Sequence, residues 1–210
     1  MKFIKRCSFI ICVLVASFCN PVMAIEEPDY QEVLKQGNFE IREYAAKIIA
    51  HVSVSGDFDD ASSKGFKLLA DYIFGNNFTE EGSSNKISMT APVEMAPLSQ
   101  QVQITAPILQ HGYTQEWQVN FVMPKEYDLI SLPKPNNPSV QLIEVPPKKY
   151  AVIVFSGLVR ESSYEEKANL LNQFLIDQSL QALGPVKIAR YNPPWTLPFF
   201  RRNELMVEIN

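Results

Sequence analysis

The feature that most constrains the fold is an approximate repeat at an offset of 101 residues. Residues 41–56, IREYAAKIIAHVSVSG, align with residues 142–157, LIEVPPKKYAVIVFSG. The identical pairs are Glu43/Glu144, Lys47/Lys148, Ala50/Ala151, Ser55/Ser156 and Gly56/Gly157. Since these identities fall at the same place before each of two expected helices, we predict two related halves.

Alternation with a period of two predicts eight strands. The clearest case is WQVNFVM, where Trp117, Val119 and Phe121 fall on one face and the polar Gln118 and Asn120 on the other. The expected strands are residues 39–44, 47–55, 86–90, 117–123, 140–145, 150–156, 186–191 and 204–209.

Two segments have the spacing of amphipathic helices. The first runs from about Asp59 to Phe74, and its apolar stripe contains Phe66, Leu69 and Ile73. The second, YEEKANLLNQFLIDQSLQALGP, is expected to begin at a capping box and to end at a Gly-Pro pair. The residues of that box and that pair are Ser163, Glu166, Gly184 and Pro185.

The order strand, strand, helix, strand, strand therefore occurs twice. Two such halves can pair their strands into one curved antiparallel sheet or open barrel, with the helices packed outside. This is an α+β fold. The expected divisions are half 1 at about 39–123, a connector at 124–139 and half 2 at about 140–209. Four prolines in the connector exclude a helix or a central strand there.

The first 24 residues are expected to be a signal peptide. Lys2, Lys5 and Arg6 precede a nearly apolar run from Cys7 to Cys19, and a cleavage pattern ends at Ala24. We predict cleavage after Ala24, a single domain at 25–210 in the periplasm or secreted, and no membrane insertion after cleavage.

Cleavage changes the chemistry that is open to the chain. All three cysteines lie in the first 24 residues, which excludes a disulfide, a thiolate nucleophile or a cysteine-bound metal in the mature chain. Cleavage also leaves 16 basic against 23 acidic residues, a net charge of −7. No structural metal is expected, and a chain this acidic has no electrostatic reason to bind nucleic acid.

Three segments together resemble the SOUL haem-binding protein family. They are NKISMTAPVEM (85–95), LPKPNNPSV (132–140) and YNPPWTLPFFRRNEL (191–205), and the resemblance runs from about Glu40 to Ile209. It implies two pseudo-twofold-related ββαββ halves that form a curved sheet or distorted eight-stranded barrel. It also implies haem binding in a shallow hydrophobic cleft and kinship with effector-binding domains that hold bulky molecules.

The MTAPV motif has a structural and a functional interpretation. In the structural one, Met89 and Val93 are core, Thr90 bonds local backbone and Pro92 sets the strand end. In the functional one, Met89 or Met95 lines a cleft for a flat, polarisable ligand.

A second copy of the motif, QITAPIL, follows at 103–109. It lies in an insertion relative to the family pattern. The role of its TAP residues (105–107) stays open, and one reading is a duplication that lengthens a loop over the cleft.

The candidate iron ligands are histidines. His51 lies on a mixed strand face that is either solvent or cleft, and His111 lies in the inserted loop. His51 is the candidate metal ligand, with a non-ligand role as the alternative. In some family members a histidine regarded as the iron ligand stands where this chain has Glu43.

Basic residues are candidates for the haem propionates. Lys64 and Lys67 lie on the first helix, where the alternative is that they are merely solvated. Ser63 and Asp71 occupy positions that are basic in haem-binding relatives.

The C-terminal PPWTLPFFRRNE segment provides the other candidate lining. Trp195, Phe199 and Phe200 offer flat apolar surface, beside Arg201 and Arg202 for carboxylates. The alternative is a proline-stiffened loop whose aromatic residues plug the end of the barrel.

The family resemblance, together with the expected signal peptide, predicts an exported, noncovalent binder of haem or another tetrapyrrole, acting as a carrier, buffer or scavenger. The alternatives are a binder of other amphipathic small molecules without iron ligation, and a protein whose cleft docks a peptide or partner. Motifs typical of enzymes are missing. We therefore predict no enzyme. A hydrolase of the related fold, with Glu204 in the cleft, is the remaining enzymatic alternative.

Overall fold

A computed structural model describes residues 25–98 and 115–210. The expected signal peptide, His111 and the second TAP motif lie outside the described residues. The architecture is α+β, with two helices and a nine-stranded antiparallel sheet, which confirms the predicted class. Neither helix in the described ranges is long and apolar enough to cross a membrane.

The strands and helices follow the expected order, with additions. They are β1 Tyr30–Gln36, β2 Phe39–Tyr44, β3 Lys47–Gly56, α1 Phe58–Ile73, β4 Asn77–Phe78, β5 Val93–Pro97, β6 Gln115–Val122, β7 Lys134–Pro135, β8 Gln141–Val145, β9 Lys148–Phe155, α2 Glu161–Asp177, β10 Lys187–Arg190, the 3-10 helix η1 Pro198–Phe200 and β11 Asn203–Ile209.

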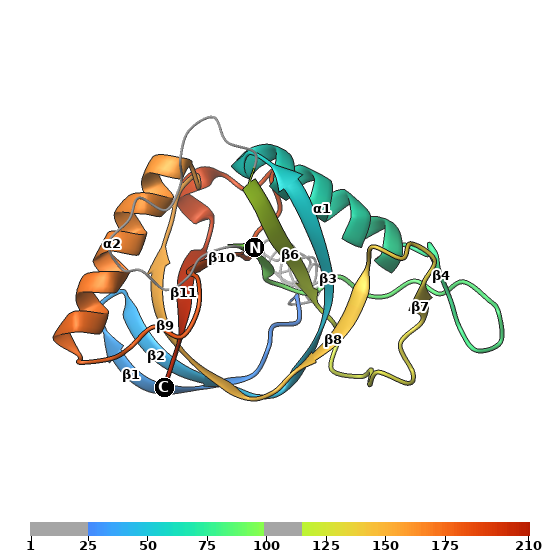
Figure 1. The fold of residues 1–210 in the computed structure, drawn as a ribbon, viewed down its shortest axis with the longest axis horizontal. Coiled ribbons are helices and arrows are strands. Elements are labelled where there is room, and N and C mark those ends of the chain that lie inside the picture. Colours follow the sequence, from blue (N-terminus) through green and yellow to red (C-terminus); the bar gives the residue numbers. More distant parts are fainter. Residues whose placement is uncertain (1–24, 99–114) are drawn as a thin grey trace, which may run out of the picture.

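The strand order of the main sheet is symmetric about its middle. It reads β1-β2-β9-β11-β10-β5-β6-β3-β8. Without β1, the strands β2, β3, β5 and β6 of the first half occupy the same places, counted from one edge, as β8, β9, β10 and β11 of the second half counted from the other edge. The sheet is strongly curved (Figure 1), but among the described residues its edges β1 and β8 do not pair. The curved-sheet prediction is confirmed, and the sheet stays open rather than closing into a barrel.

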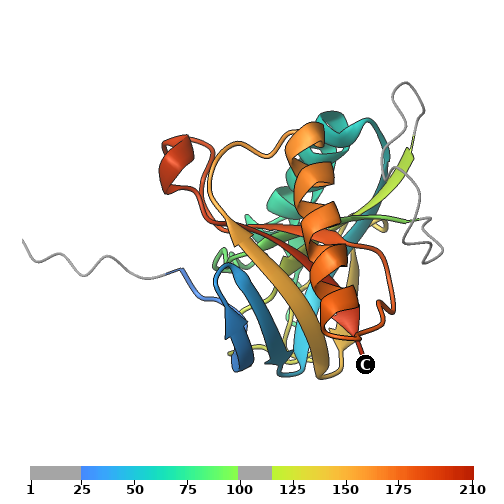
Figure 2. The ribbon, with the colours of Figure 1, turned by 90° about the vertical axis from the view of Figure 1, so that its left-hand side faces the viewer.

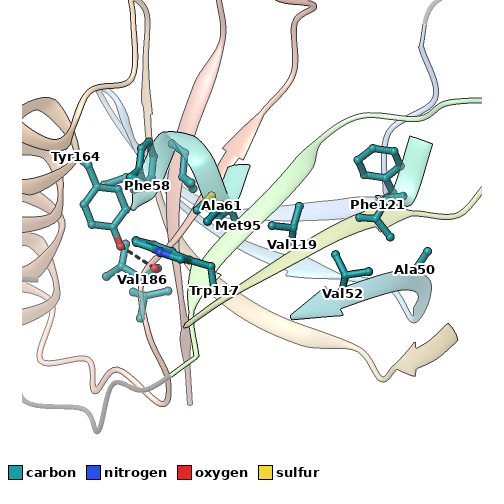
Figure 3. Packing of buried hydrophobic residues seen from close by; sticks show 14 of the residues in the cluster. Ala50, Val52, Phe58, Ala61, Met95, Trp117, Val119, Phe121, Tyr164 and Val186 are labelled. Carbon is teal, nitrogen blue, oxygen red and sulfur yellow. Dashed lines mark hydrogen bonds between the residues drawn. The ribbon is translucent and has the colours of Figure 1, made fainter. Parts of the chain in front are cut away.

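Both helices pack on one face of this sheet. α1 contacts β3 and β6, and α2 contacts β9 and β11. Figure 3 shows where the helices meet in the core: Phe58 of α1 lies beside Trp117 of β6 and Tyr164 of α2. The ring centroids of Phe58 and Trp117 are 5.5 Å apart. The buried Tyr164 hydroxyl donates to the carbonyl oxygen of Val186 at 2.8 Å, so its polar end is satisfied.

The period-two pattern of β6 decides which face is buried. Trp117, Val119 and Phe121 join the helix-covered core, while Asn120 points to the opposite face and bonds His51 there. Gly65 of α1 permits a close approach, because a Cβ at this position would lie 2.6 Å from Val119 Cβ.

The predicted strand at 86–90 is wrong. No strand is found there, and β5 begins instead at Val93, after the cis peptide bond between Ala91 and Pro92. Irregular contacts replace a ladder. The amide of Ile87 donates to Ile73 O at 2.8 Å, and the Thr90 hydroxyl donates to Val122 O at 2.5 Å.

The second helix also differs from the prediction. It begins at Glu161 with Arg160 as N-cap, because Ser163 Oγ accepts from the amide of Arg160 at 2.8 Å. It ends at Asp177 instead of continuing to Gly184, since Ser179 takes a left-handed conformation with φ of 55°.

Two smaller differences from the prediction concern residues that are exposed to solvent. The edge strand β1 was not predicted, because most of its side chains are exposed and give no alternating apolar pattern. In α1, Leu69 and Ile73 are buried as expected, whereas Phe66 remains 38% exposed.

Candidate functional site

The sheet face opposite the helices, which we call the helix-free face, is rich in charged and aromatic side chains. Successive side chains of a strand point to opposite faces, so the neighbours of the side chains that enter the helix-covered core lie on the helix-free face. They include Glu40, Arg42, Tyr44, Lys47, His51, Glu94, Asn120, Tyr150, Lys187, Tyr191 and Glu204.

Glu204 is the centre of an ion-pair network on this face. It is fully buried, and its carboxylate accepts two hydrogen bonds from Arg42, at 2.8 and 3.0 Å. The Tyr191 hydroxyl donates to it at 2.8 Å, and Arg202 Nε donates at 2.9 Å. Arg42 also donates to Glu40 at 2.6 Å.

A second buried carboxylate, Glu94, is held by two lysines. Lys47 donates to it at 2.5 Å and Lys187 at 3.3 Å, and Lys187 also donates to Tyr150 Oη at 3.1 Å. Lys187 Nζ lies 4.4 Å from the centre of the Tyr150 ring.

These pairings control the protonation states. Burial would raise the pKa of Glu94, but the charges of Lys187 and Lys47 outweigh burial and lower that pKa to about 2. Burial would lower the pKa of Arg42, yet its bonds to Glu204 raise it above the usual arginine range. Each buried charge is therefore compensated within the network. A carboxylate held by two arginines has no vacancy for a cationic ligand or for proton transfer to a substrate, which argues against Glu204 as a catalytic group.

The MTAPV motif and the segment before β1 cover one end of this face. The amide of Ala91 donates to Glu26 O at 2.9 Å, and Arg202 pairs with Glu27 at 3.0 Å. Beside these contacts lies a pocket of about 270 Å³. Its lining includes Glu26, Asp29, Ala46, Lys47, Thr90, Val122 and Tyr127.

His51 lies on the helix-free face and is half-buried. Its Nδ1 lies 2.8 Å from Asn120 Oδ1 and its Nε2 lies 3.3 Å from Ser53 Oγ. Both ring nitrogens thus have polar neighbours, and binding a metal would require His51 to give up one of them.

The other residues of the first half do not converge on His51. Met89 is 41% exposed, so it is not core, whereas Met95 is buried among the core residues rather than lining a cleft. Lys64 and Lys67 are exposed on α1, and Lys64 donates to Ser55 O at 3.3 Å.

The segment from Trp195 to Phe200, which we call the aromatic loop, projects from the body of the molecule. Figure 2 shows η1 (red) standing out at the upper left. Trp195 is 83% exposed, Phe199 65% and Phe200 69%, so these rings do not plug the barrel. The loop is tied to the body where the Gly157 amide donates to Pro198 O at 3.0 Å. Clusters of exposed apolar side chains often mark binding sites in proteins.

The two predicted arginines differ. Arg202 is neutralised by Glu204 and Glu27. Arg201 Nε donates to Thr196 O at 2.8 Å, and its Nη2 donates to Pro194 O, so both acceptors are neutral carbonyls in the aromatic loop or directly before it. Arg190, which the sequence reading missed, lies at the end of β10, and burial lowers its pKa although the charge of Asp59 opposes that effect. Its position at the end of a short strand gave no signal in the sequence.

Solved structures share this fold at low sequence identity. The C-terminal domain of EcmrR has a TM-score of 0.59 at 10% identity, covering 86% of this chain and 98% of that chain. EcmrR in a complex with DNA has a TM-score of 0.60 at 10% identity, covering 96% and 63% respectively. A hydrolase from Listeria innocua has a TM-score of 0.51 at 10% identity, covering 85% and 94%. At these identities the likeness shows the fold alone.

Comparison by sequence gives a more specific answer. No curated protein matches the chain. The family model described as SOUL heme-binding protein matches residues 25–208, nearly the whole of the described chain. The chain therefore belongs to the SOUL heme-binding protein family.

Proposed function

We propose that this chain is an exported protein that binds haem or a related planar tetrapyrrole noncovalently, as a carrier, buffer or scavenger. Membership of the SOUL heme-binding protein family supports the ligand class. The structural observation that most supports the proposal is the aromatic loop, where Trp195, Phe199 and Phe200 present flat apolar surface to solvent.

The pocket beside the MTAPV motif matches a tetrapyrrole poorly. A pocket of about 270 Å³ lies below the range of roughly 300–1,000 Å³ that encloses drug-sized ligands. It is also lined by several charged side chains, which suit a macrocycle poorly. A tetrapyrrole instead gains contact area by stacking against exposed rings, as the aromatic loop allows.

The chain's residues fit a tetrapyrrole that is held by its ring and its acid groups. The aromatic loop offers the apolar surface, and Arg201, which directly follows the loop and donates to Thr196 O, offers a cation. His51 lies on the helix-free face with both ring nitrogens engaged. We therefore propose that His51 is not needed for capture, whereas loss of the rings weakens it.

A haemin titration of residues 25–210, followed by absorbance, tests this proposal. We expect a saturable, shifted Soret band at one equivalent. The band should persist in His51→Ala and His111→Ala, and the affinity should fall about tenfold or more in Trp195→Ala/Phe199→Ala. A broad band that never saturates would show nonspecific adsorption and contradict the proposal. Loss of the band in His51→Ala alone would instead assign that residue as the iron ligand.

A second candidate is binding of other amphipathic small molecules without iron ligation. The engaged state of His51 favours it, because a ligand held only by stacking needs no metal. Metal-free protoporphyrin binding as tightly as haemin would support this mode. If the chain binds neither compound yet captures a defined peptide, the docking alternative replaces both.

Export is part of the proposal and has its own test. The predicted signal peptide at 1–24 supports it. The N-terminus of the mature protein, sequenced after expression in a bacterium with separated periplasmic and cytoplasmic fractions, should begin at Ile25 in the periplasmic fraction or the medium. Full-length protein that remains in the cytoplasm would contradict export.

A further inference from the structure

We propose that the aromatic loop docks this protein on a phospholipid bilayer, by inserting its apolar side chains into the interfacial region of the membrane. The occupant is the lipid surface itself, and the chain would lie on that surface without crossing it. This inference goes beyond the proposed function, because it rests on the geometry of the loop and requires no tetrapyrrole.

The loop presents large apolar side chains at the tip of a protrusion. Trp195, Leu197, Phe199 and Phe200 are each 56% to 83% exposed, and η1 stands out from the body of the molecule (Figure 2). The ring centroids of Phe199 and Phe200 lie 4.5 Å apart, so the two rings form one continuous surface. A protein partner would need a pocket that matches this convex tip, whereas a fluid bilayer adapts to it.

The backbone of the loop satisfies many of its own polar groups. Three of residues 193–200 are prolines, which have no amide hydrogen to satisfy. The amides of Thr196 and Phe200 donate within the segment, at 3.0 and 2.9 Å. Carbonyl oxygens that accept a hydrogen bond are those of Pro193, Pro194, Thr196, Leu197 and Pro198.

Arg201 and Gly157 supply several of these bonds from outside the loop. Arg201 donates to Thr196 O and Pro194 O through its side chain, and its amide donates to Pro198 O at 3.0 Å. The Gly157 amide donates to the same oxygen at 3.0 Å. Because a backbone group that leaves water without a partner costs several kcal/mol, a loop with this many internal bonds is suited to enter lipid.

The charge distribution favours the same occupant. The chain has 23 acidic residues, yet residues 191–202 contain none and end in Arg201 and Arg202. An acidic side chain beside the rings would resist transfer to a region of low dielectric constant. Tryptophan is typical of the membrane interface, because its ring is apolar and its N–H can bond at the level of the headgroups. The loop therefore has the composition of an interfacial segment.

The two tryptophans of the chain make this contact measurable. Trp117 is 1% exposed and its Nε1 donates to Gly56 O at 3.2 Å, whereas Trp195 is 83% exposed. A change of tryptophan emission on mixing with lipid therefore reports on the loop. The experiment titrates residues 25–210 with phosphatidylcholine vesicles and with vesicles of brominated phosphatidylcholine, which quench tryptophans that reach the acyl chains. Sedimentation of the vesicles measures the bound fraction.

The test variant is Phe199→Ser/Phe200→Ser, which retains Trp195 as the reporter. The matched control is Ile130→Ser/Ile176→Ser, because Ile130 and Ile176 are 78% and 61% exposed outside the loop. Circular dichroism melts of both variants should match the unmodified chain, since all four side chains are largely exposed.

We expect the emission of the unmodified chain to shift to shorter wavelength with vesicles and to be quenched by the brominated lipid. The partition coefficient should fall about tenfold or more in Phe199→Ser/Phe200→Ser and stay unchanged in the control. Binding should persist in 1 M NaCl, because apolar insertion is not screened by salt.

Four outcomes would overturn the proposal. They are no shift and no sedimentation of the unmodified chain, equal binding by the loop variant, loss of binding in 1 M NaCl, and a dimer in solution that Phe199→Ser/Phe200→Ser converts to a monomer. The last would assign the loop to a second copy of the chain. The haemin titration contains no lipid, so its failure would remove the proposed function and leave the membrane contact standing.

Discussion

Individual charged residues on the helix-free face are stabilised by partners far away in the sequence. Arg42 and Glu204, 162 positions apart, form a bidentate pair in which both side chains are almost fully buried. Such a pair is costly to desolvate, and removal of one partner leaves an uncompensated charge. The network therefore fixes the strand pairing between the two halves more than it adds net stability.

Glu94 gives a prediction about pH. Its pKa is lowered to about 2 in the folded protein, from an ordinary value of 4.5, because Lys187 and Lys47 outweigh its burial. A lowered pKa contributes stability that is fully present above about pH 5 and is lost as the pH falls toward 2. The loss should be on the order of 3 kcal/mol.

Urea denaturation at several pH values between 2 and 7 measures this contribution. Glu94→Gln should be less stable at neutral pH and should show a flatter dependence below pH 5 than the unmodified chain. Glu116→Gln, an exposed acid on β6, is the matched control and should keep the slope. An unchanged slope in Glu94→Gln would contradict the prediction.

At the scale of elements, the contact of α1 with the sheet depends on a missing side chain. Gly65 faces β6, where an added Cβ would lie 2.6 Å from Val119 Cβ. The helix can approach this closely only because position 65 has no Cβ. The closeness in turn buries Leu69 and Ile73, which share that face of α1.

We predict that Gly65→Ala destabilises the protein by about 1–3 kcal/mol in thermal or urea unfolding. The direction is informative, because alanine in place of glycine within a helix ordinarily stabilises by roughly 0.5–1 kcal/mol. Ser63→Ala, at an exposed position of the same helix, is the control and should be neutral or slightly stabilising. Val119→Ala should partly rescue Gly65→Ala, and failure to rescue would argue against this contact.

At the scale of the whole molecule, stability should decrease from the middle of the sheet to its edges. β9 and β11 are paired on both sides, whereas β1 and β8 are the edge strands and expose more of their backbone. The aromatic loop is exposed and lies outside the main sheet, so a ligand bound there need not disturb the core.

Native-state hydrogen exchange should therefore show slow amides in β9 and β11 and faster ones in β1 and β8. On saturation with haemin, added protection should be confined to the aromatic loop and the neighbouring end of β10. Protection that appears mainly on the helix-free face around His51 would instead place the ligand there.

The sequence alone determined both helices and most of the strands of the main sheet, because alternation and helical spacing are local properties of the chain. It also predicted an α+β fold with a curved sheet, and the three family segments pointed to the family to which the chain belongs. It did not determine the strand at 86–90 or the end of α2, where single backbone contacts outweigh the pattern.

Only the tertiary structure decided which charged residues are free. Arg201 and Arg202 are adjacent in sequence and equally basic, yet Arg202 is neutralised by Glu204 and Glu27 while Arg201 bonds only neutral carbonyls. The reason is physical. The availability of a charge depends on counter-ions that folding brings close, and the separation of two residues in sequence does not tell how far apart they lie in space.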